Sequence, residues 1–262
     1  MSITREAAEN MIRLFGKEDA FGLAQTDPEY FERIANFAFD EVPNEEAAAL
    51  DERTRFMAIL AVLTGVQGID LFREMVPAAL NAGVTPVEIR EIVYQATAYL
   101  GFGRVYPFLK AVSEILQEKG IDLPLAPQAT TDAGIADLTD PVGRRRAGND
   151  VQIKYFGEGI RNGWEKGPQE KRHISAWLAD NCFGDYYTRN GLTDPQREMI
   201  TFCFIAGQGG CEPQLTAHAA ANMRIGNDKQ FLISVVSQCL PYIGYPRSLN
   251  ALVCINKAAE NN

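Results

Sequence analysis

The residue types that can move a proton or attack a substrate gather in the C-terminal part of the chain. Cys211, Gln214 and His218 are separated by three and four positions, so on a helix they share one face. Cys211 stands at the expected helix start, where free N–H groups and the helix dipole favour a thiolate. Glu198 begins the preceding helix, and an antiparallel hairpin through residues 207–210 would return it beside His218. A carboxylate on one ring nitrogen fixes the imidazole tautomer and leaves the other nitrogen free to move a proton.

Each of these residues also has a purely structural interpretation. A single histidine on an amphipathic helix is often a satisfied structural residue, and Cys211 is a small side chain suited to a core. Glu198 near a helix start also favours the helix dipole. His173 lies in a charged stretch, so we expect it on a solvated face. Core positions are predicted for the four cysteines that lie in apolar runs: Cys182, Cys203, Cys239 and Cys254. An aromatic cluster is predicted to pack together, and some of its members could form the wall of a pocket: Trp177, Phe183, Tyr186 and Tyr187.

An internal repeat places a second, altered copy of this region earlier in the chain. Arg55 and Arg197 lie 142 positions apart within similar segments that begin at Leu50 and Leu192. The period is too long for a solenoid, so the chain is interpreted as two fused subunits. After one extra residue in the second copy the offset becomes 143, and it pairs Gly83, Gln95, Tyr99, Gly101, Arg104 and Leu109 with Gly226, Gln238, Tyr242, Gly244, Arg247 and Leu252.

The two copies differ where the chemistry is expected. Where the second copy has its three reactive residues, the first copy has apolar ones. In the alignment of the repeats, Phe56 matches Glu198, Ile69 matches Cys211, and Val76 lies near the position of His218. One copy therefore carries an acid, a thiol and an imidazole, and the other carries none of them. This asymmetry places the candidate site in the second copy and makes the first copy degenerate.

Both copies are predicted to be helical. Proline and N-cap signals precede the apolar runs of the second copy, with helix starts expected near residues 194, 211, 228 and 246, and glycines end the runs. An amphipathic helix precedes each block, over residues 28–40 and 169–181. Because no convincing period-2 strand occurs, we predict an all-α fold of two similar bundles. The predicted division is a first repeat over 1–120, a Pro-, Thr- and Asp-rich linker over 121–142, and a second repeat over 143–262.

Composition argues against several classes of protein. Among 262 residues, 25 Lys and Arg against 34 Asp and Glu give a net charge of −9, which disfavours nucleic acids and anionic membranes as partners. No run of apolar residues is long enough to span a bilayer, and the first twenty residues lack the apolar core of a signal peptide. Five cysteines form an odd set, which favours the cytoplasm over a secreted disulfide framework. Two histidines without a Cys-x-x-Cys make a metal site unexpected.

At these residues the sequence resembles the carboxymuconolactone decarboxylase family, which includes the AhpD-like alkylhydroperoxidases. The resemblance is strongest in the second copy, over residues 192–199, 209–218 and 241–251, and weaker in the first, over 50–55, 81–89 and 99–102. It implies an all-helical AhpD-like fold that assembles as trimers or hexameric rings. The two tandem bundles are then expected to form an intrachain pseudodimer, and the chain a homo-oligomer, as a trimer of pseudodimers.

The resemblance also bears on the reaction. The peroxidase branch of the family uses a Cys-x-x-Cys ahead of the histidine and a glutamate one helix earlier, which Cys211, His218 and Glu198 match. Gln214 replaces the second cysteine, so no disulfide can close within the motif. The decarboxylase branch has an acidic and then an apolar residue in front of the histidine, and Gln214-Leu215 matches this with an amide in place of the acid.

We therefore expect a small organic acid or lactone as the substrate. His218 is the expected general acid/base, passing a proton to the carbanion or enolate formed as carbon dioxide leaves, and Glu198 orients it. No cofactor is expected, since the substrate itself can delocalise the negative charge. The candidate substrate-binding residues are Gln214, Arg197, Tyr242 and Arg247. For the two arginines a structural ion pair is the alternative, because Arg55 and Arg104 stand at the same places in the degenerate copy.

Two other functions stay open at this point. One is a single-cysteine peroxidase or oxidoreductase that acts through Cys211. The other is a non-catalytic ligand-binding or assembly module, which a filled core around His218 would favour. The sequence leaves the identity of the substrate open.

Overall fold

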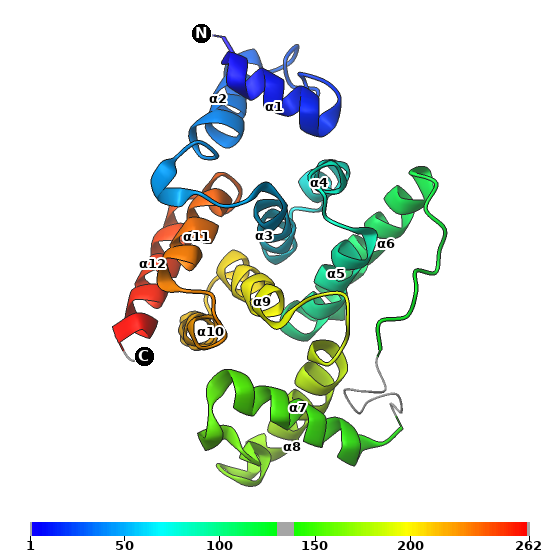
Figure 1. The fold of residues 1–262 in the computed structure, drawn as a ribbon, viewed down its shortest axis with the longest axis vertical. Coiled ribbons are helices and arrows are strands. Elements are labelled where there is room, and N and C mark those ends of the chain that lie inside the picture. The colour runs from blue at the N-terminus through cyan, green and yellow to red at the C-terminus, as the bar shows by residue number, and fades with distance from the viewer. Residues whose placement is uncertain (1, 130–138, 261–262) are drawn as a thin grey trace.

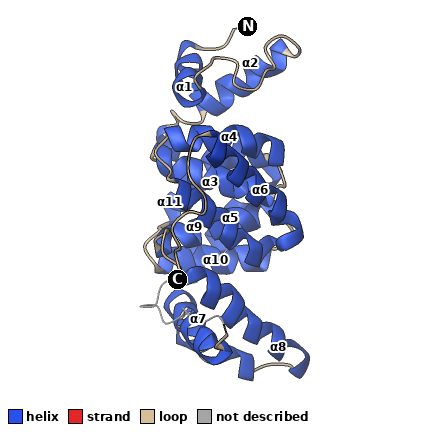
Figure 2. Ribbon diagram, turned by 90° about the vertical axis from the view of Figure 1, so that its right-hand side faces the viewer, coloured by secondary structure: helices blue, strands red, loops and turns tan. Residues whose placement is uncertain are grey.

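The computed structural model describes residues 2–129 and 139–260, and all the regular structure within these ranges is helical (Figures 1 and 2). The prediction of an all-α fold is confirmed. The first repeat contains α1 (Arg5–Phe15), α2 (Pro28–Asn36), α3 (Glu52–Gly65), α4 (Ile69–Asn81), α5 (Pro86–Leu100) and α6 (Phe102–Glu118). The second contains α7 (Pro141–Phe156), α8 (Gln169–Trp177), α9 (Asp194–Gln208), α10 (Glu212–Arg224), α11 (Lys229–Ile243) and α12 (Tyr245–Glu260).

Five short helices of other types complete these elements. They are η1 (Phe37–Glu41), η2 (Glu46–Ala48), η3 (Glu158–Ile160), η4 (Gly163–Glu165) and η5 (Leu178–Tyr187). Of these, η1 and η5 are π-helices that continue directly from α2 and α8. The duplication is therefore visible in the bounds: α2 and α8 are both nine residues long and start 141 positions apart, and α5 and α11 are both 15 residues long and start 143 apart.

Local signals fix the ends of the helices that carry the candidate residues. Thr193 caps α9 in a reciprocal capping box with Gln196, which satisfies N–H groups that the first turn leaves free. The helix ends at Gly209, which has a φ of 70°, a conformation that side chains with a Cβ rarely adopt. The chain then turns through Gly210 into α10. The predicted α9–α10 hairpin is thus present.

Helices of both repeats form one central block, in which α3 and α9 cross (Figure 1). The crossing is close because two glycines face each other: a Cβ on Gly65 would lie 2.7 Å from the carbonyl oxygen of Phe204, and one on Gly207 would lie 2.7 Å from that of Val62. These reciprocal contacts describe an approximate two-fold relation between the repeats. Around it α5 packs on α9 and α11 packs on α3, so each repeat sends one helix across to the other. The repeats therefore form an intrachain pseudodimer.

The remaining helices lie at the two ends of the molecule, α1 and α2 at one end and α7 and α8 at the other (Figures 1 and 2). Of the predicted linker, residues 130–138 lie outside the described residues. Before them, Ile121, Leu123 and Leu125 pack against the core, and α7 already begins at Pro141. No helix within the described ranges has the length and apolar character needed to cross a membrane.

We expect the glycine crossing to be intolerant of a methyl group. Gly207→Ala places its Cβ against the backbone of α3, and the resulting overpacking should lower the free energy of unfolding by about 1–3 kcal/mol. Gly103→Ala is the matched control, because its Cβ meets nothing within 4 Å; its effect should lie between no change and a gain of about 1 kcal/mol. Urea denaturation followed by circular dichroism measures both, and equal midpoints for Gly207→Ala and wild type would contradict the close crossing.

Candidate active site

The structure brings Glu198 and His218 into direct contact. Glu198 lies in the second turn of α9, His218 lies in the middle of α10, and Nδ1 of the imidazole is 2.8 Å from the carboxylate Oε2. Glu198 has no exposed surface, and His218 is 7% exposed. Because an ionised carboxylate can only accept, Nδ1 carries the proton of this bond and Nε2 is the nitrogen left for chemistry. The pairing expected from the spacing is therefore present.

The second oxygen of the glutamate is held by a phenol. Tyr187, the last residue of η5, donates to Glu198 Oε1 at 2.9 Å. The Tyr187 hydroxyl also lies 2.8 Å from Thr201 Oγ1 and 2.6 Å from the hydroxyl of Tyr99, which comes from α5 of the first repeat. Burial, assisted by the negative charge of Glu198, raises the pKa of both phenols well above the usual value of 10. Both therefore remain protonated at neutral pH.

The imidazole ring is fixed on its other sides by aromatic rings and by the backbone. The rings of Tyr99 and Phe156 meet it edge-on, each with its centroid 5.4 Å away. Asn222, one turn further along α10, donates to the carbonyl oxygens of Glu198 at 3.0 Å and of His218 at 2.8 Å. This side chain ties α9 to α10 at the level of the pair. The arrangement can hold one tautomer of His218 in one orientation.

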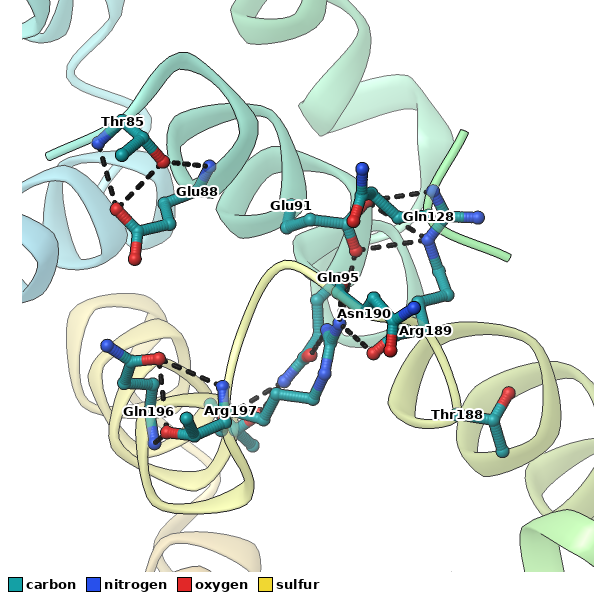
Figure 3. Close-up of polar contacts among 12 residues, drawn as sticks. Thr85, Glu88, Glu91, Gln95, Gln128, Thr188, Arg189, Asn190, Gln196 and Arg197 are labelled. Atoms are coloured by element: carbon teal, nitrogen blue, oxygen red, sulfur yellow. Dashed lines mark hydrogen bonds and ion pairs between the residues drawn. The ribbon is translucent and has the colours of Figure 1, made fainter. Parts of the chain in front are cut away.

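Arg197, predicted to bind the substrate, serves a structural role instead. Its side chain is 1% exposed and forms an ion pair with Glu91 Oε2 at 3.2 Å (Figure 3). The same guanidinium donates to Gln95 Oε1 at 2.7 Å and to the carbonyl oxygens of Arg189 and Asn190. Burial lowers the pKa of Arg197, although Glu91 opposes the effect. Because these donors are used inside the protein, we exclude Arg197 from the site; the ion-pair alternative describes it.

Cys211 and Arg247 lie together, but in a different place from the imidazole. Both line a cavity of about 260 Å³ at the start of α10, and Cys211 is partly exposed there. Gln208 donates its amide to the thiol Sγ at 3.1 Å, and Arg247 donates to the carbonyl of Gly207. Seven residues separate Cys211 from His218, which is about 10 Å along a helix. The predicted group is thus divided between a buried pair and a cavity two turns away.

The other two candidate residues are not part of the buried pair. Gln214 is exposed on α10. Tyr242 packs against the core cluster that contains most of the first repeat, where its phenol faces Arg55, and burial raises its pKa to about 12. Its repeat counterpart Tyr99 occupies the corresponding place beside His218. The tyrosine of α11 thus belongs to the degenerate half, and the tyrosine of α5 belongs to the candidate site.

Tyr99, Tyr187 and Phe156 are the site residues that sequence reasoning missed. The alignment of the repeats could have indicated Tyr99, because it pairs this residue with Tyr242, which is a candidate site residue. In two units related by a two-fold axis, a helix of one unit often packs against the other unit. Tyr187 was expected only to pack or to wall a pocket. Most expectations for the other residues are confirmed: the four remaining cysteines, Phe183 and Tyr187 are buried, and His173 is exposed. The packing expected for Trp177 is wrong, because this side chain is 60% exposed beside the ring of His173.

Comparison with known proteins connects this geometry to a family. The model of the carboxymuconolactone decarboxylase family matches the chain twice, over residues 28–114 and 173–256, one match in each repeat. Among solved structures, the chain is similar to a crystal structure from Burkholderia xenovorans LB400 assigned as a gamma-carboxymuconolactone decarboxylase subunit, with a TM-score of 0.53 and 18% identity over 98% of this chain and 97% of that one. This similarity shows the fold alone. No curated protein sequence matches the chain.

The buried ion pair beneath the site predicts a large effect on stability. Glu91→Gln leaves the Arg197 guanidinium buried without its counter-charge, so the free energy of unfolding should fall by about 3–5 kcal/mol. Glu52→Gln removes the carboxylate of the more exposed Arg13–Glu52 pair and should cost less than about 1 kcal/mol. Urea denaturation at neutral pH measures both losses. A cost for Glu91→Gln no larger than that for Glu52→Gln would show that the buried pair is not required.

Proposed function

Because the chain belongs to the carboxymuconolactone decarboxylase family, we propose that it is an enzyme that moves a proton on a small organic acid or lactone through His218. The observation that carries the proposal is the 2.8 Å bond between Nδ1 and the buried carboxylate of Glu198. Tyr187 occupies the other carboxylate oxygen, so the glutamate holds the ring in one tautomer. Nε2 is then the atom that gives and takes the proton.

The proposed reaction balances without an added redox partner. The carbon–carbon bond to a substrate carboxylate breaks, carbon dioxide leaves, and the electron pair stays on the adjacent carbon, where a conjugated carbonyl of the substrate delocalises it. Protonated His218 then delivers its Nε2 proton to that carbon and becomes neutral. Water restores the proton. Glu198 holds the ring through the Nδ1–H bond and keeps its orientation throughout.

The burial of His218 limits the substrate to a small molecule. The cavity at the start of α10 ends at Leu215, which precedes the imidazole by one helical turn. A substrate in this cavity could place a carboxylate at Arg247, the one candidate arginine that faces it. Because the imidazole is 7% exposed, the proposal requires that Leu215 or Phe156 move aside when the substrate enters.

Cys211 supports a second candidate function, a single-cysteine peroxidase. The thiol lies at the N-cap of α10, is partly exposed, faces a cavity and accepts a hydrogen bond from Gln208, so a small oxidant can reach it. Against it, the His218–Glu198 pair lies two turns away, so it does not serve this thiol as a proton relay.

A non-catalytic module is the third candidate. The low exposure of His218 and the two aromatic rings beside it favour this candidate. The Glu198 carboxylate and the phenol bound to it oppose it, because burying a charge is costly and a plain core would hold apolar residues, as the first repeat does at Phe56 and Val76.

The outer faces of α6 and α12 support self-association as part of this proposal. Exposed apolar residues follow one another at helical spacing on both: Phe102 and Tyr106 on α6, and Tyr245, Leu249 and Val253 on α12. Phe102 and Tyr245 are repeat counterparts, as are Tyr106 and Leu249. Exposed apolar stripes of this kind mark interfaces. Since both repeats carry the stripe, a second copy of the chain is the proposed partner, and the resemblance implies a trimer of pseudodimers.

Turnover by variants tests the proton transfer. Purified protein is assayed with lactones, 3-oxo acids and peroxides, by carbon dioxide release, ring opening and peroxide loss. His218→Gln and Glu198→Gln should each lower turnover of the accepted acid or lactone by at least about 100-fold, because they remove the proton carrier or its tautomer control. His173→Gln is the matched control at the other, exposed histidine and should leave turnover unchanged. Full turnover in His218→Gln excludes the mechanism, and peroxide loss that Cys211→Ser alone abolishes establishes the second candidate.

Light scattering after size-exclusion chromatography tests the association. The double substitution Leu249→Glu and Val253→Glu places two charges on the α12 stripe and should reduce the mass to that of one chain, 28.9 kDa. Ile12→Glu, at an exposed apolar residue of α1 outside the stripes, should leave the mass of the assembly unchanged. A wild-type mass of one chain, or an unaltered assembly in the double variant, refutes an interface at this face.

A further inference from the structure

We infer that the degenerate first repeat completes the site of the second: Tyr99 is a positioning residue that sets, through Tyr187, how strongly Glu198 holds the His218 imidazole. The role of this contact in turnover rests on the proposed function, whereas the contact itself does not. Three hydrogen bonds in series, of 2.6, 2.9 and 2.8 Å, lead from the first repeat to the ring.

The direction of each bond follows from counting protons. Tyr187 has one hydroxyl proton, and the Glu198 carboxylate can only accept, so Tyr187 donates to Glu198. Its oxygen must therefore accept from its other two neighbours. Tyr99 and Thr201 are thus both donors to Tyr187, at 2.6 and 2.8 Å.

A second side chain of the first repeat fixes the Thr201 branch. Gln95, one turn before Tyr99 on α5, accepts from Arg197 at its Oε1. Its Nε2 is therefore turned toward Thr201 Oγ1, to which it donates at 2.8 Å. Because Thr201 receives this proton, its own hydroxyl proton is free to point at Tyr187. Both branches of the network are thus oriented by α5.

These directions have a consequence for the imidazole. A hydroxyl that accepts hydrogen bonds becomes a stronger donor, because bonds in a chain polarise one another. Tyr99 therefore strengthens the bond from Tyr187 to Oε1, and the charge of Glu198 is drawn toward that oxygen. Less charge remains on Oε2, so the carboxylate pulls less strongly on the Nδ1 proton of His218. Tyr99 in this way weakens the hydrogen bond between the His218 ring and Glu198.

The other half of the molecule offers a matched control. Tyr242 is the repeat counterpart of Tyr99 on α11, and it is buried to a similar degree. Its phenol faces Arg55, and Phe56 stands where Glu198 would be. Loss of the Tyr242 hydroxyl therefore changes the packing of an equivalent tyrosine without touching the donor series.

The imidazole itself reports the effect in nuclear magnetic resonance spectra of the ¹⁵N-labelled protein without substrate. The chain has two histidines, and His173→Gln assigns the ring signals of His218. Tyr99→Phe should move the Nδ1–H proton resonance downfield, because Glu198 then pulls harder on it. Tyr187→Phe, which removes the direct donor, should move it further in the same direction. Tyr242→Phe should leave it unchanged.

A variant in which the Tyr99 hydroxyl is a stronger donor tests the inference without removing that hydroxyl. Incorporation of 3-fluorotyrosine at position 99 retains the ring and makes the hydroxyl a better donor, so the resonance should move upfield. An unchanged resonance in Tyr99→Phe beside a shifted one in Tyr187→Phe would overturn the inference, as would equal shifts in Tyr99→Phe and Tyr242→Phe. If Tyr99→Phe does not fold, the direction of the fluorotyrosine shift decides. Since no substrate is present, failure here leaves the His218→Gln turnover test untouched.

Discussion

A carboxylate with no exposed surface persists in a folded protein only when donors satisfy its oxygens, and Glu198 imposes this requirement on four elements at once. It stands on α9, and its donors come from α10 and η5, while the phenol behind the second donor comes from α5. The α9–α10 turn, the π-helix that follows α8 and the crossing of α5 onto the second repeat all meet at this side chain. A shift in any of them would leave the buried carboxylate with an oxygen that accepts no hydrogen bond. The position of the carboxylate therefore depends on how these four elements pack together.

The same crossing couples stability to the site. Arg197 precedes Glu198 in sequence and points away from it, into the ion pair with Glu91 of α5. Gln95, one turn further along α5, bonds both to Arg197 and to Thr201. One face of α5 thus binds the start of α9 through a salt bridge. The same face binds the hydroxyl groups around Glu198 through the Gln95 amide and the Tyr99 phenol. In physical terms the first repeat is part of the candidate site, even though it lacks an acid and an imidazole of its own.

The parts of this arrangement that are local in sequence could be predicted, and those that cross the repeats could not. Glu198 and His218 lie on consecutive helices joined by a glycine turn, so helical spacing and one hairpin suffice to bring them together. Tyr99 and Tyr187 are 88 positions apart, and their contact depends on α5 crossing to the other repeat, which periodicity within one helix does not encode. The partner of Arg197 is 106 positions away, so the sequence leaves substrate binding and a structural ion pair equally open for this residue. Cys211 shows the limit of the spacing argument, since residues on one helical face can still be two turns apart.

The degenerate half shows how a similar polar framework is arranged without a central carboxylate. Phe56 and Val76 fill the places of the acid and the imidazole, yet the polar residues around those places are retained. In this half the Tyr242 phenol faces Arg55, while Arg55 Nη2 and Gln238 Oε1 are buried and make no hydrogen bond within the part of the chain described. In the half that carries the candidate site, Gln95 Oε1 accepts from Arg197 and the Tyr99 hydroxyl bonds to Tyr187. Arg197 Nε is also buried without a hydrogen bond among the described residues, and each such group costs about 1–3 kcal/mol, so both halves carry unsatisfied polar atoms. The two repeats therefore share one polar framework, and the buried acid with its imidazole is what distinguishes the second repeat.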